Sequence, residues 1–138
     1  MRILGVDYGK ARTGVAVSDA LGLMAHGIET IFSSNMRRVA ESVAKLAKEY
    51  EAGIIVVGLP KNMNNTLGER AEKTIRFTKL LEEECGVEVV TWDERLSTVS
   101  AINVLNETNT RGEKRKAVID TVAAQIILQS YLDYIRKE

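Results

Sequence analysis

The N-terminal part of the chain consists of short apolar runs that are separated by polar or glycine-containing joints. Such runs occupy residues 2–8, 13–19 and 24–31, and the sequence GKAR joins the first two. Apolar runs of this length between turn-forming residues are typical of β-strands, and a joint that contains Gly9 is typical of a hairpin. The pattern therefore predicts three consecutive strands that pair as an antiparallel meander.

The rest of the chain alternates between helical and strand-like patterns. In the stretch SSNMRRVAESVAKLAKEYE, cap-forming residues precede apolar positions at helical spacing, such as Val39, Val43 and Leu46. The run AGIIVVGLP is typical of a buried parallel strand, and Gly86 is placed to end a helix before the run VEVVTW. We expect helices at 33–51, 67–85, 99–105 and 116–136 and strands at 52–60 and 87–92.

The order of these elements defines the predicted fold class. Strands that alternate with helices pair in parallel, whereas the first three strands pair antiparallel. The prediction is an α/β fold with a five-stranded mixed sheet, in which three antiparallel strands are followed by two parallel strands and helices flank the sheet. On the second helix, the core-facing side is expected to hold Ala71, Ile75, Thr78, Leu80 and Leu81.

Length and composition predict one globular domain over residues 1–138, since 45% of the residues are hydrophobic and 28% are charged. The 19 basic and 19 acidic residues give a formal net charge of zero. This balance argues against binding to nucleic acid by bulk charge, but it is compatible with a local basic patch. The single Cys85 cannot form an internal disulfide, and no apolar run resembles a signal peptide or spans a bilayer. We therefore expect a cytoplasmic protein with no membrane partner.

Acidic residues stand at the ends of the predicted strands. Asp7 ends the first strand, and Asp93 and Glu94 follow the fifth strand. Asp120 lies early in the last helix. Because the carboxyl ends of parallel strands meet at one edge of a sheet, we expect these acids to gather there, where oxygen ligands suit Mg²⁺ or Mn²⁺. Each acid could instead cap a helix or form a turn, and the pattern alone leaves both interpretations open.

Four blocks of the sequence resemble the signature motifs of the YqgF/RuvX family. They are GVDYGKARTGVAVSD, IVVGLPKNMNNTLGERA, DERLST and VIDTVAAQIILQSYL, and they span nearly the whole chain in order. Members of this family are described as RNase H-like, Holliday junction resolvase-like nucleases that are linked to maturation of the 5′ end of pre-16S rRNA. The resemblance implies an RNase H-like sheet with helices on both faces. It also implies that Asp7, Glu94 and Asp120 are catalytic and hold divalent metal, with two Mg²⁺ or Mn²⁺ ions as the hypothesis.

The adjacent acids Asp93 and Glu94 compete for one place in this predicted site. If the alternation of the fifth strand continues, their side chains point to opposite faces of the sheet, so that only one of them can join Asp7. We assign Glu94 to the site. His26 is the single histidine, so the chain offers no Ser/His/Asp or Cys/His arrangement, and water is the expected nucleophile.

Cationic and amide side chains near these acids are the predicted contacts to a nucleic acid. Lys10 and Arg12 lie in the first hairpin turn, where they either bind phosphates beside the scissile bond or face solvent. Instead of contacting the nucleic acid, Asn62 could form a turn and Arg95 could pair with an acid. The predicted substrate-binding residues are Lys10, Arg12, Lys61, Asn62, Arg95 and Lys116.

The predicted reaction is hydrolysis of phosphodiester bonds in structured nucleic acid, and processing of the 5′ end of pre-16S rRNA is the favoured hypothesis. Resolution of Holliday junctions in DNA and a non-catalytic RNA-binding role in ribosome assembly are the alternatives. The stretch DYGKARTG also resembles the first phosphate-binding hairpin of actin-like sugar kinases, but those proteins need a duplicated domain. Paired nicks in a junction favour a homodimer and trimming of one strand does not, so both monomer and homodimer stay open.

Overall fold

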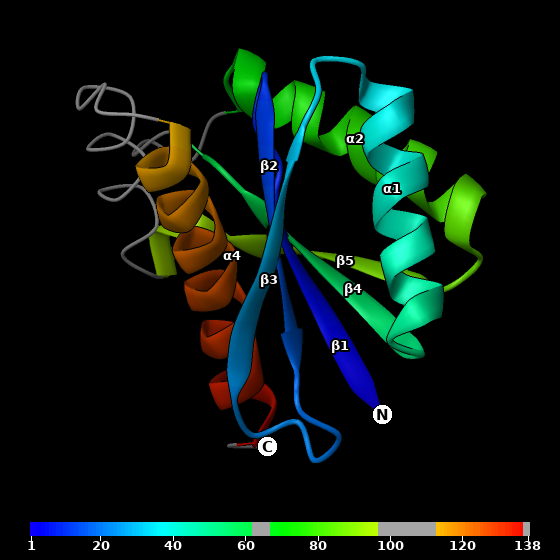
Figure 1. Cartoon of the computed structure of the whole chain (residues 1–138), viewed down its shortest axis with the longest axis vertical. Coiled ribbons are helices and arrows are strands. Elements are labelled where there is room, and N and C mark those ends of the chain that lie inside the picture. Colours follow the sequence, from blue (N-terminus) through cyan, green and yellow to red (C-terminus); the bar gives the residue numbers. More distant parts are fainter. Residues whose placement is uncertain (62–66, 97–112, 137–138) are drawn as a thin grey trace.

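The computed structural model describes residues 1–61, 67–96 and 113–136, with the backbone alone for residues 113–119. Its strands are β1 (Arg2–Asp7), β2 (Arg12–Ser18), β3 (Ala25–Phe32), β4 (Ala52–Leu59) and β5 (Glu88–Asp93). They form one sheet with the order β3-β2-β1-β4-β5 (Figure 1). The β1–β2 and β2–β3 pairs are antiparallel, whereas the β1–β4 and β4–β5 pairs are parallel. The predicted mixed sheet is confirmed.

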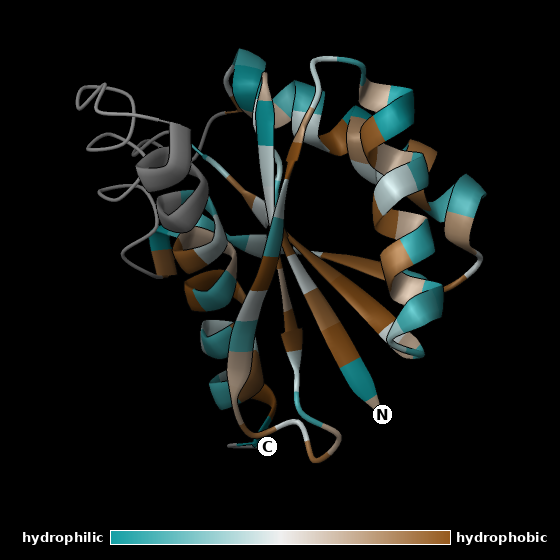
Figure 2. Cartoon of the chain, in the orientation of Figure 1, coloured by the Kyte–Doolittle hydropathy of each residue, from teal (hydrophilic) through white to brown (hydrophobic). Residues whose placement is uncertain are grey.

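Helices cover both faces of this sheet. α1 (Met36–Glu49) and α2 (Glu69–Cys85) lie on one face, and α4 (Glu113–Arg136) lies on the other (Figure 1). A 3₁₀ turn, η1 (Glu94–Leu96), directly follows β5. The strands at the centre are largely apolar (Figure 2), and alternate side chains enter two separate cores, one under α1 and α2 and one under α4.

The core-facing side of α2 differs in part from the sequence-based prediction. Thr74 and Phe77, which the prediction omitted, are buried, whereas Ile75 and Leu80 are only half-buried. The Phe77 ring stacks on the ring of Tyr8 from the end of β1, with centroids 4.3 Å apart and an angle of 13° between the planes. The large aromatic side chain sets which side of α2 turns inward, and its contribution is not visible in the helical period alone.

The helix ends follow local chemistry. The Asn35 side chain accepts a hydrogen bond from the backbone N–H of Arg38 at the start of α1, and Gly86 adopts a left-handed φ of 67° directly after α2, as predicted for a C-cap. The last helix begins at Glu113 and not at 116. The charged residues at this end are compatible with a helix, because lysine, arginine and glutamate are good helix formers. The helix expected at 99–105 lies outside the described residues.

Glycines let α4 lie directly on the backbone of the sheet. A Cβ atom on Gly14 of β2 would stand 2.0 Å from the backbone oxygen of Asp120, and one on Gly5 of β1 would stand 2.6 Å from Cβ of Leu128. Real Cβ atoms do not approach other atoms so closely, so only glycine is accommodated at these positions without a shift of the helix. The depth at which α4 rests on the sheet, and with it the position of Asp120, therefore depends on these two residues.

We expect Gly14→Ala to destabilise the protein by about 3 kcal/mol, because the new methyl group forces α4 away from β2. Urea denaturation followed by circular dichroism measures this loss. Gly53→Ala in β4 is the matched control, because a Cβ there meets only the flexible end of the Met1 side chain. Equal stabilities of the two variants would contradict the close approach of α4 as the cause.

Candidate active site

Three acids from distant parts of the chain lie at one edge of the sheet. Asp7 is the last residue of β1 and Glu94 is the first residue after β5, and the parallel strands β1, β4 and β5 end on the same side. Asp120 lies on α4 where this helix touches Gly14. All three side chains are buried, with relative exposures of 6%, 1% and 5% in chain order. The structure thus brings together the acids that the sequence singled out.

Gly58 of β4 makes room for the Glu94 carboxyl group. A Cβ atom on Gly58 would stand 3.0 Å from Oε1 of Glu94 and 2.5 Å from Cδ1 of Ile127 on α4. The Glu94 carboxyl group therefore lies over the backbone of β4, the strand next to β1. From there it acts electrostatically on Asp7.

Burial and like charge change the protonation of these acids. Burial, followed by the negative charge of Glu94, raises the pKa of Asp7 to about 8, and Asp120 adds to the effect. Burial also raises the pKa of Glu94, although a hydrogen bond with Asp7 works in the opposite direction. At neutral pH we therefore expect Asp7 to carry a proton and to donate it in a hydrogen bond to Glu94.

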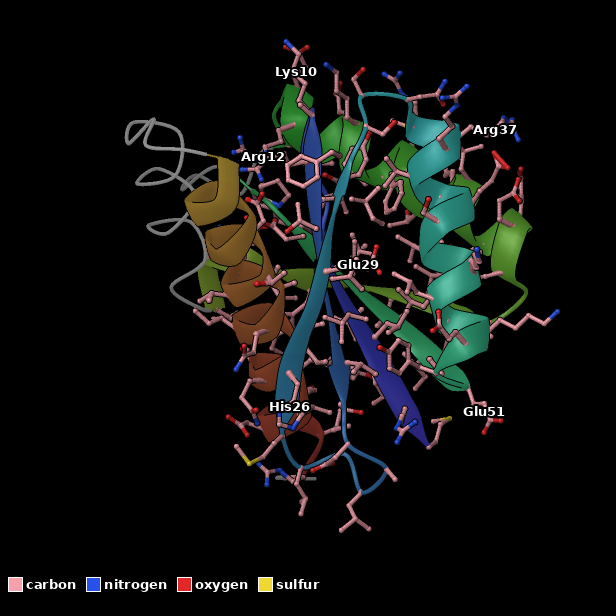
Figure 3. All side chains as sticks on the ribbon, viewed as in Figure 1. Lys10, Arg12, His26, Glu29, Arg37 and Glu51 are labelled. Carbon is pink, nitrogen blue, oxygen red and sulfur yellow. The ribbon has the colours of Figure 1, made fainter. Side chains whose placement is uncertain are left out.

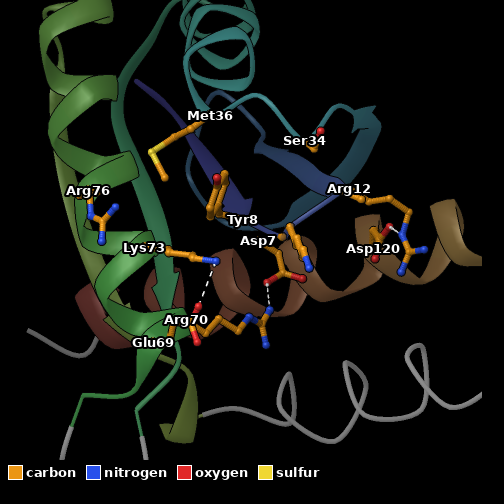
Figure 4. A pocket seen from close by; sticks show the side chains of 13 residues that line it. Asp7, Tyr8, Arg12, Ser34, Met36, Glu69, Arg70, Lys73, Arg76 and Asp120 are labelled. Atoms are coloured by element: carbon orange, nitrogen blue, oxygen red, sulfur yellow. Dashed lines mark hydrogen bonds and ion pairs between the residues drawn. The ribbon is translucent and has the colours of Figure 1, made fainter.

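Two arginines offset part of the negative charge. The Arg12 guanidinium donates from Nε to Oδ2 of Asp120 at 2.9 Å, and Nη2 of Arg70 lies 3.7 Å from Oδ1 of Asp7 (Figure 4). Arg70 lowers the pKa of both Asp7 and Glu94, but less than burial raises it. Arg12 belongs to β2 and Arg70 to α2, so two different elements supply these cations.

The structure distinguishes between the adjacent acids Asp93 and Glu94. Asp93 accepts hydrogen bonds from the backbone N–H and the guanidinium of Arg95, with Nη2 at 2.6 Å from Oδ2. These hydrogen bonds hold the pKa of Asp93 below its ordinary value. Glu94 turns inward to Asp7, as the sequence-based assignment expected, and Asp93 faces outward with Arg95.

A cavity of about 740 Å³ adjoins Asp7 and Asp120. Of the predicted substrate contacts, Lys10 and Arg12 line it, and both lie at the end of the sheet opposite His26 (Figure 3). Its lining is Asp7, Tyr8, Gly9, Lys10, Ala11, Arg12, Ser34, Met36, Glu69, Arg70, Lys73, Arg76 and Asp120.

The other predicted contacts are placed differently. Lys61 lies close enough to Asp93 to lower the pKa of that acid, and Arg95 is ion-paired with Asp93; neither lines the cavity. Asn62 lies outside the described residues, as does the side chain of Lys116, whose backbone is in the first turn of α4. A contact of these residues with substrate stays a prediction.

The cavity is also lined by three cations that are not among the predicted substrate contacts. They are Arg70, Lys73 and Arg76, and all three lie on α2. The signal that could have found them is their spacing of three residues, which keeps side chains near one side of a helix.

The three carboxylates have the donor chemistry that a hard divalent cation prefers. Oδ1 of Asp7 is buried and accepts no hydrogen bond from any donor in the described part of the chain. Carboxylate oxygens are the ligands that Mg²⁺ and Mn²⁺ prefer. As arranged here, however, no three His, Cys, Asp or Glu side chains within residues 1–61, 67–96 and 120–136 form a set that could hold one ion, and Asp120 is engaged by Arg12.

Solved structures share this fold over nearly the whole chain. Thermus thermophilus RuvC in complex with Holliday junction substrate aligns with a TM-score of 0.64 at 16% identity and covers 99% of this chain and 96% of its own. The fowlpox virus Holliday junction resolvase aligns with a TM-score of 0.53 at 16% identity, covering 97% and 99%. At these identities the similarity establishes the fold, which is the RNase H-like fold of RuvC-type resolvases.

Sequence comparison identifies the family within this fold class. The chain belongs to the RuvX family, described as Holliday junction resolvase, whose model matches residues 1–134. A relative from Clostridium beijerinckii is 47% identical over 138 residues and covers 100% of both chains. One from Halothermothrix orenii is 50% identical over 137 residues and covers 99% of this chain and 98% of its own. Both are named "Putative pre-16S rRNA nuclease", so the resemblance in the four sequence blocks is confirmed and the family is one of nucleases.

None of the helices in the described ranges is long and apolar enough to cross a bilayer.

The raised pKa of Asp7 predicts how stability depends on pH. Between its ordinary pKa of 3.8 and the folded value of about 8, the folded protein keeps a proton that the unfolded chain releases, so Asp7 lowers stability as the pH rises through this window. Without divalent ions, we expect Asp7→Asn to stabilise the protein by about 1–3 kcal/mol at pH 8 and much less at pH 4. Urea denaturation at both pH values measures the difference.

Asp93→Asn is the matched control for this prediction. The pKa of Asp93 is lowered by the hydrogen bond from Arg95, so this acid contributes stability above its ordinary pKa, and its loss should destabilise the protein at neutral pH. A destabilising Asp7→Asn at pH 8 would contradict the raised pKa of Asp7.

Proposed function

We propose that this protein is a metal-dependent endonuclease that hydrolyses phosphodiester bonds in structured nucleic acid, and that the 5′ end of pre-16S rRNA is its substrate in the cytoplasm. The observation that carries the proposal is the burial of Asp7, Glu94 and Asp120 together beside a cavity that cationic residues line. The name of the relatives at 47% and 50% identity supports the choice of RNA.

Asp7, Glu94 and Asp120 would hold the metal, Mg²⁺ or Mn²⁺, with two ions as the hypothesis. When bound, such ions lower the pKa of an attacking water and stabilise the leaving oxygen. Clustered carboxylates are costly to keep buried without such a partner. The raised pKa of Asp7 and its donor-free Oδ1 support this role, because Asp7 gives up its proton when it becomes a ligand.

Arg12 and Arg70 interact with the buried carboxylates in the free protein and would bind phosphate groups of the substrate. In the described arrangement Arg12 holds Asp120 and Arg70 lies near Asp7. Once the carboxylates are metal ligands, both guanidinium groups can turn to phosphate oxygens, which they bind in bidentate fashion. Water then adds to the phosphorus, the bond from phosphorus to the leaving oxygen breaks, and that oxygen takes up a proton.

Resolution of Holliday junctions is the second candidate function, and the description of the family favours it. Both candidates use the same carboxylates and differ in the nucleic acid that the surrounding surface accepts. Paired nicks in a four-way junction would require two copies of the chain around a two-fold axis, whereas processing of one RNA strand would not.

We expect Asp7→Asn and Glu94→Gln each to lower cleavage by more than about 100-fold, because each removes a proposed metal ligand without a large change in shape. The assay incubates the purified chain with 5′-extended pre-16S rRNA fragments and with four-way DNA junctions, each in Mg²⁺ or Mn²⁺. Gel electrophoresis of the products distinguishes the two candidate substrates.

Asp93→Asn is the control, because Asp93 is the neighbouring acid that pairs with Arg95 and faces away from Asp7. It should retain cleavage within a few-fold of wild type. Cleavage by Asp7→Asn at the wild-type rate would reject the proposed site. If the wild-type protein binds RNA but cleaves neither substrate, the non-catalytic role in ribosome assembly gains support.

A further inference from the structure

The cavity extends beyond the buried acids to an aromatic ring on β1 and a row of cations on α2. Tyr8 follows Asp7 directly, and its half-buried ring lines the cavity with the part that Phe77 leaves uncovered. Lys73 and Arg76 line the same cavity from α2 (Figure 4). In the part of the chain that the structure describes, neither of these two cations forms an ion pair with a buried acid, so the proposed metal site does not account for them.

The lining of the cavity is cationic although the chain as a whole is neutral. Five cations and three acids line it, so the charge of the lining is positive even when all three acids are ionised. Lys73 is ion-paired with Glu69 at 3.2 Å, and both side chains are well exposed, at 45% and 82%. Such an exposed pair is weak, so a phosphate can compete with Glu69 for the Lys73 ammonium group.

We propose that this groove, defined by Tyr8, Lys73 and Arg76, holds unpaired nucleotides next to the scissile phosphate. One base stacks on the ring of Tyr8, and the phosphate backbone of the strand lies along α2. The proposal rests on the proposed nuclease function and adds a substrate class to it, namely a strand that is single-stranded at this position. A cationic track beside an aromatic ring is how proteins bind single strands without reading sequence.

Geometry favours an unpaired strand over a duplex. A cavity of about 740 Å³ is in the range of pockets for small ligands, roughly 300–1,000 Å³, so it has room for a nucleotide or two but not for the width of a double helix. In a duplex the faces of the bases are covered by their neighbours, so they cannot stack on the ring of Tyr8, which lines the cavity. The ring of Tyr8 is also preorganised, because Phe77 holds it in a parallel stack.

The test measures binding without cleavage, in the absence of divalent ions. Fluorescence anisotropy follows a labelled short single-stranded RNA and a blunt duplex that contains the same strand. We expect Tyr8→Leu to weaken single-strand binding by about 5-fold or more, while Tyr8→Phe retains it because the ring is kept. In a strand labelled with 2-aminopurine, the wild type and Tyr8→Phe should quench the fluorescence of the stacked base, and Tyr8→Leu should not.

The cations are tested by the dependence of binding on salt. Arg76→Gln should weaken single-strand binding and reduce the slope of log affinity against log salt by about 0.7, the value for one lost phosphate contact. Lys79→Gln is the matched control, because Lys79 is exposed on the same helix but does not line the cavity, and it should bind within twofold of wild type. Glu69→Gln should tighten binding about twofold, since it removes an acid from the groove and releases Lys73.

Each outcome bears on the proposal. Equal binding of Tyr8→Leu and wild type, an equal effect of Arg76→Gln and Lys79→Gln, or a preference for the duplex would overturn it. Thermal melting of Tyr8→Leu shows whether the loss of the stack with Phe77 unfolds the protein. If it does, the binding of Arg76→Gln and Glu69→Gln tests the proposal instead. If the groove variants behave as expected but no substrate is cleaved, the nuclease proposal fails alone; if cleavage needs Asp7 but the groove variants bind normally, only this inference fails.

Discussion

The burial of like charges at one edge of the sheet is the constraint on which the rest of the molecule depends. Asp7, Glu94 and Asp120 are almost completely enclosed, and ionised carboxylates in such surroundings repel one another and lose their hydration. Without divalent ions the protein offsets this cost by a proton on Asp7 and by the guanidinium groups of Arg12 and Arg70. This edge therefore costs stability, as is usual for functional sites, and the proposed role of these acids as metal ligands would explain why the cost is kept.

The fold supplies the means to gather these acids. Parallel pairing of β1, β4 and β5 aligns the carboxyl ends of three strands, so an acid after β5 lies near one that ends β1. Gly14 lets α4 approach β2 until Asp120 reaches the same edge, and Gly58 leaves the space that the Glu94 carboxyl group fills. Two positions without a side chain thus decide where two of the three acids lie.

Charge placement, and not net charge, is what fits this chain to a polyanion. A formal charge of zero argues against a general affinity for nucleic acid, yet the cations that line the cavity gather there from the β1–β2 turn, from β2 and from α2. Since phosphate binding depends on local cations, such a surface attracts the phosphate backbone of a nucleic acid to one place on the protein.

Most of the fold and the identity of the buried acids could be predicted from the sequence. Element type and the caps at Asn35 and Gly86 depend on residues within a few positions of each other, so local patterns record them directly. The mixed sheet then follows from the order of strands and helices along the chain. The pairing of Arg12 with Asp120 joins residues 108 positions apart, and the stack of Tyr8 on Phe77 and the inward turn of Glu94 depend in the same way on how α2, α4 and η1 dock. Only tertiary packing decides such partners, because contacts between residues far apart in the sequence produce no periodic pattern of residue types along it.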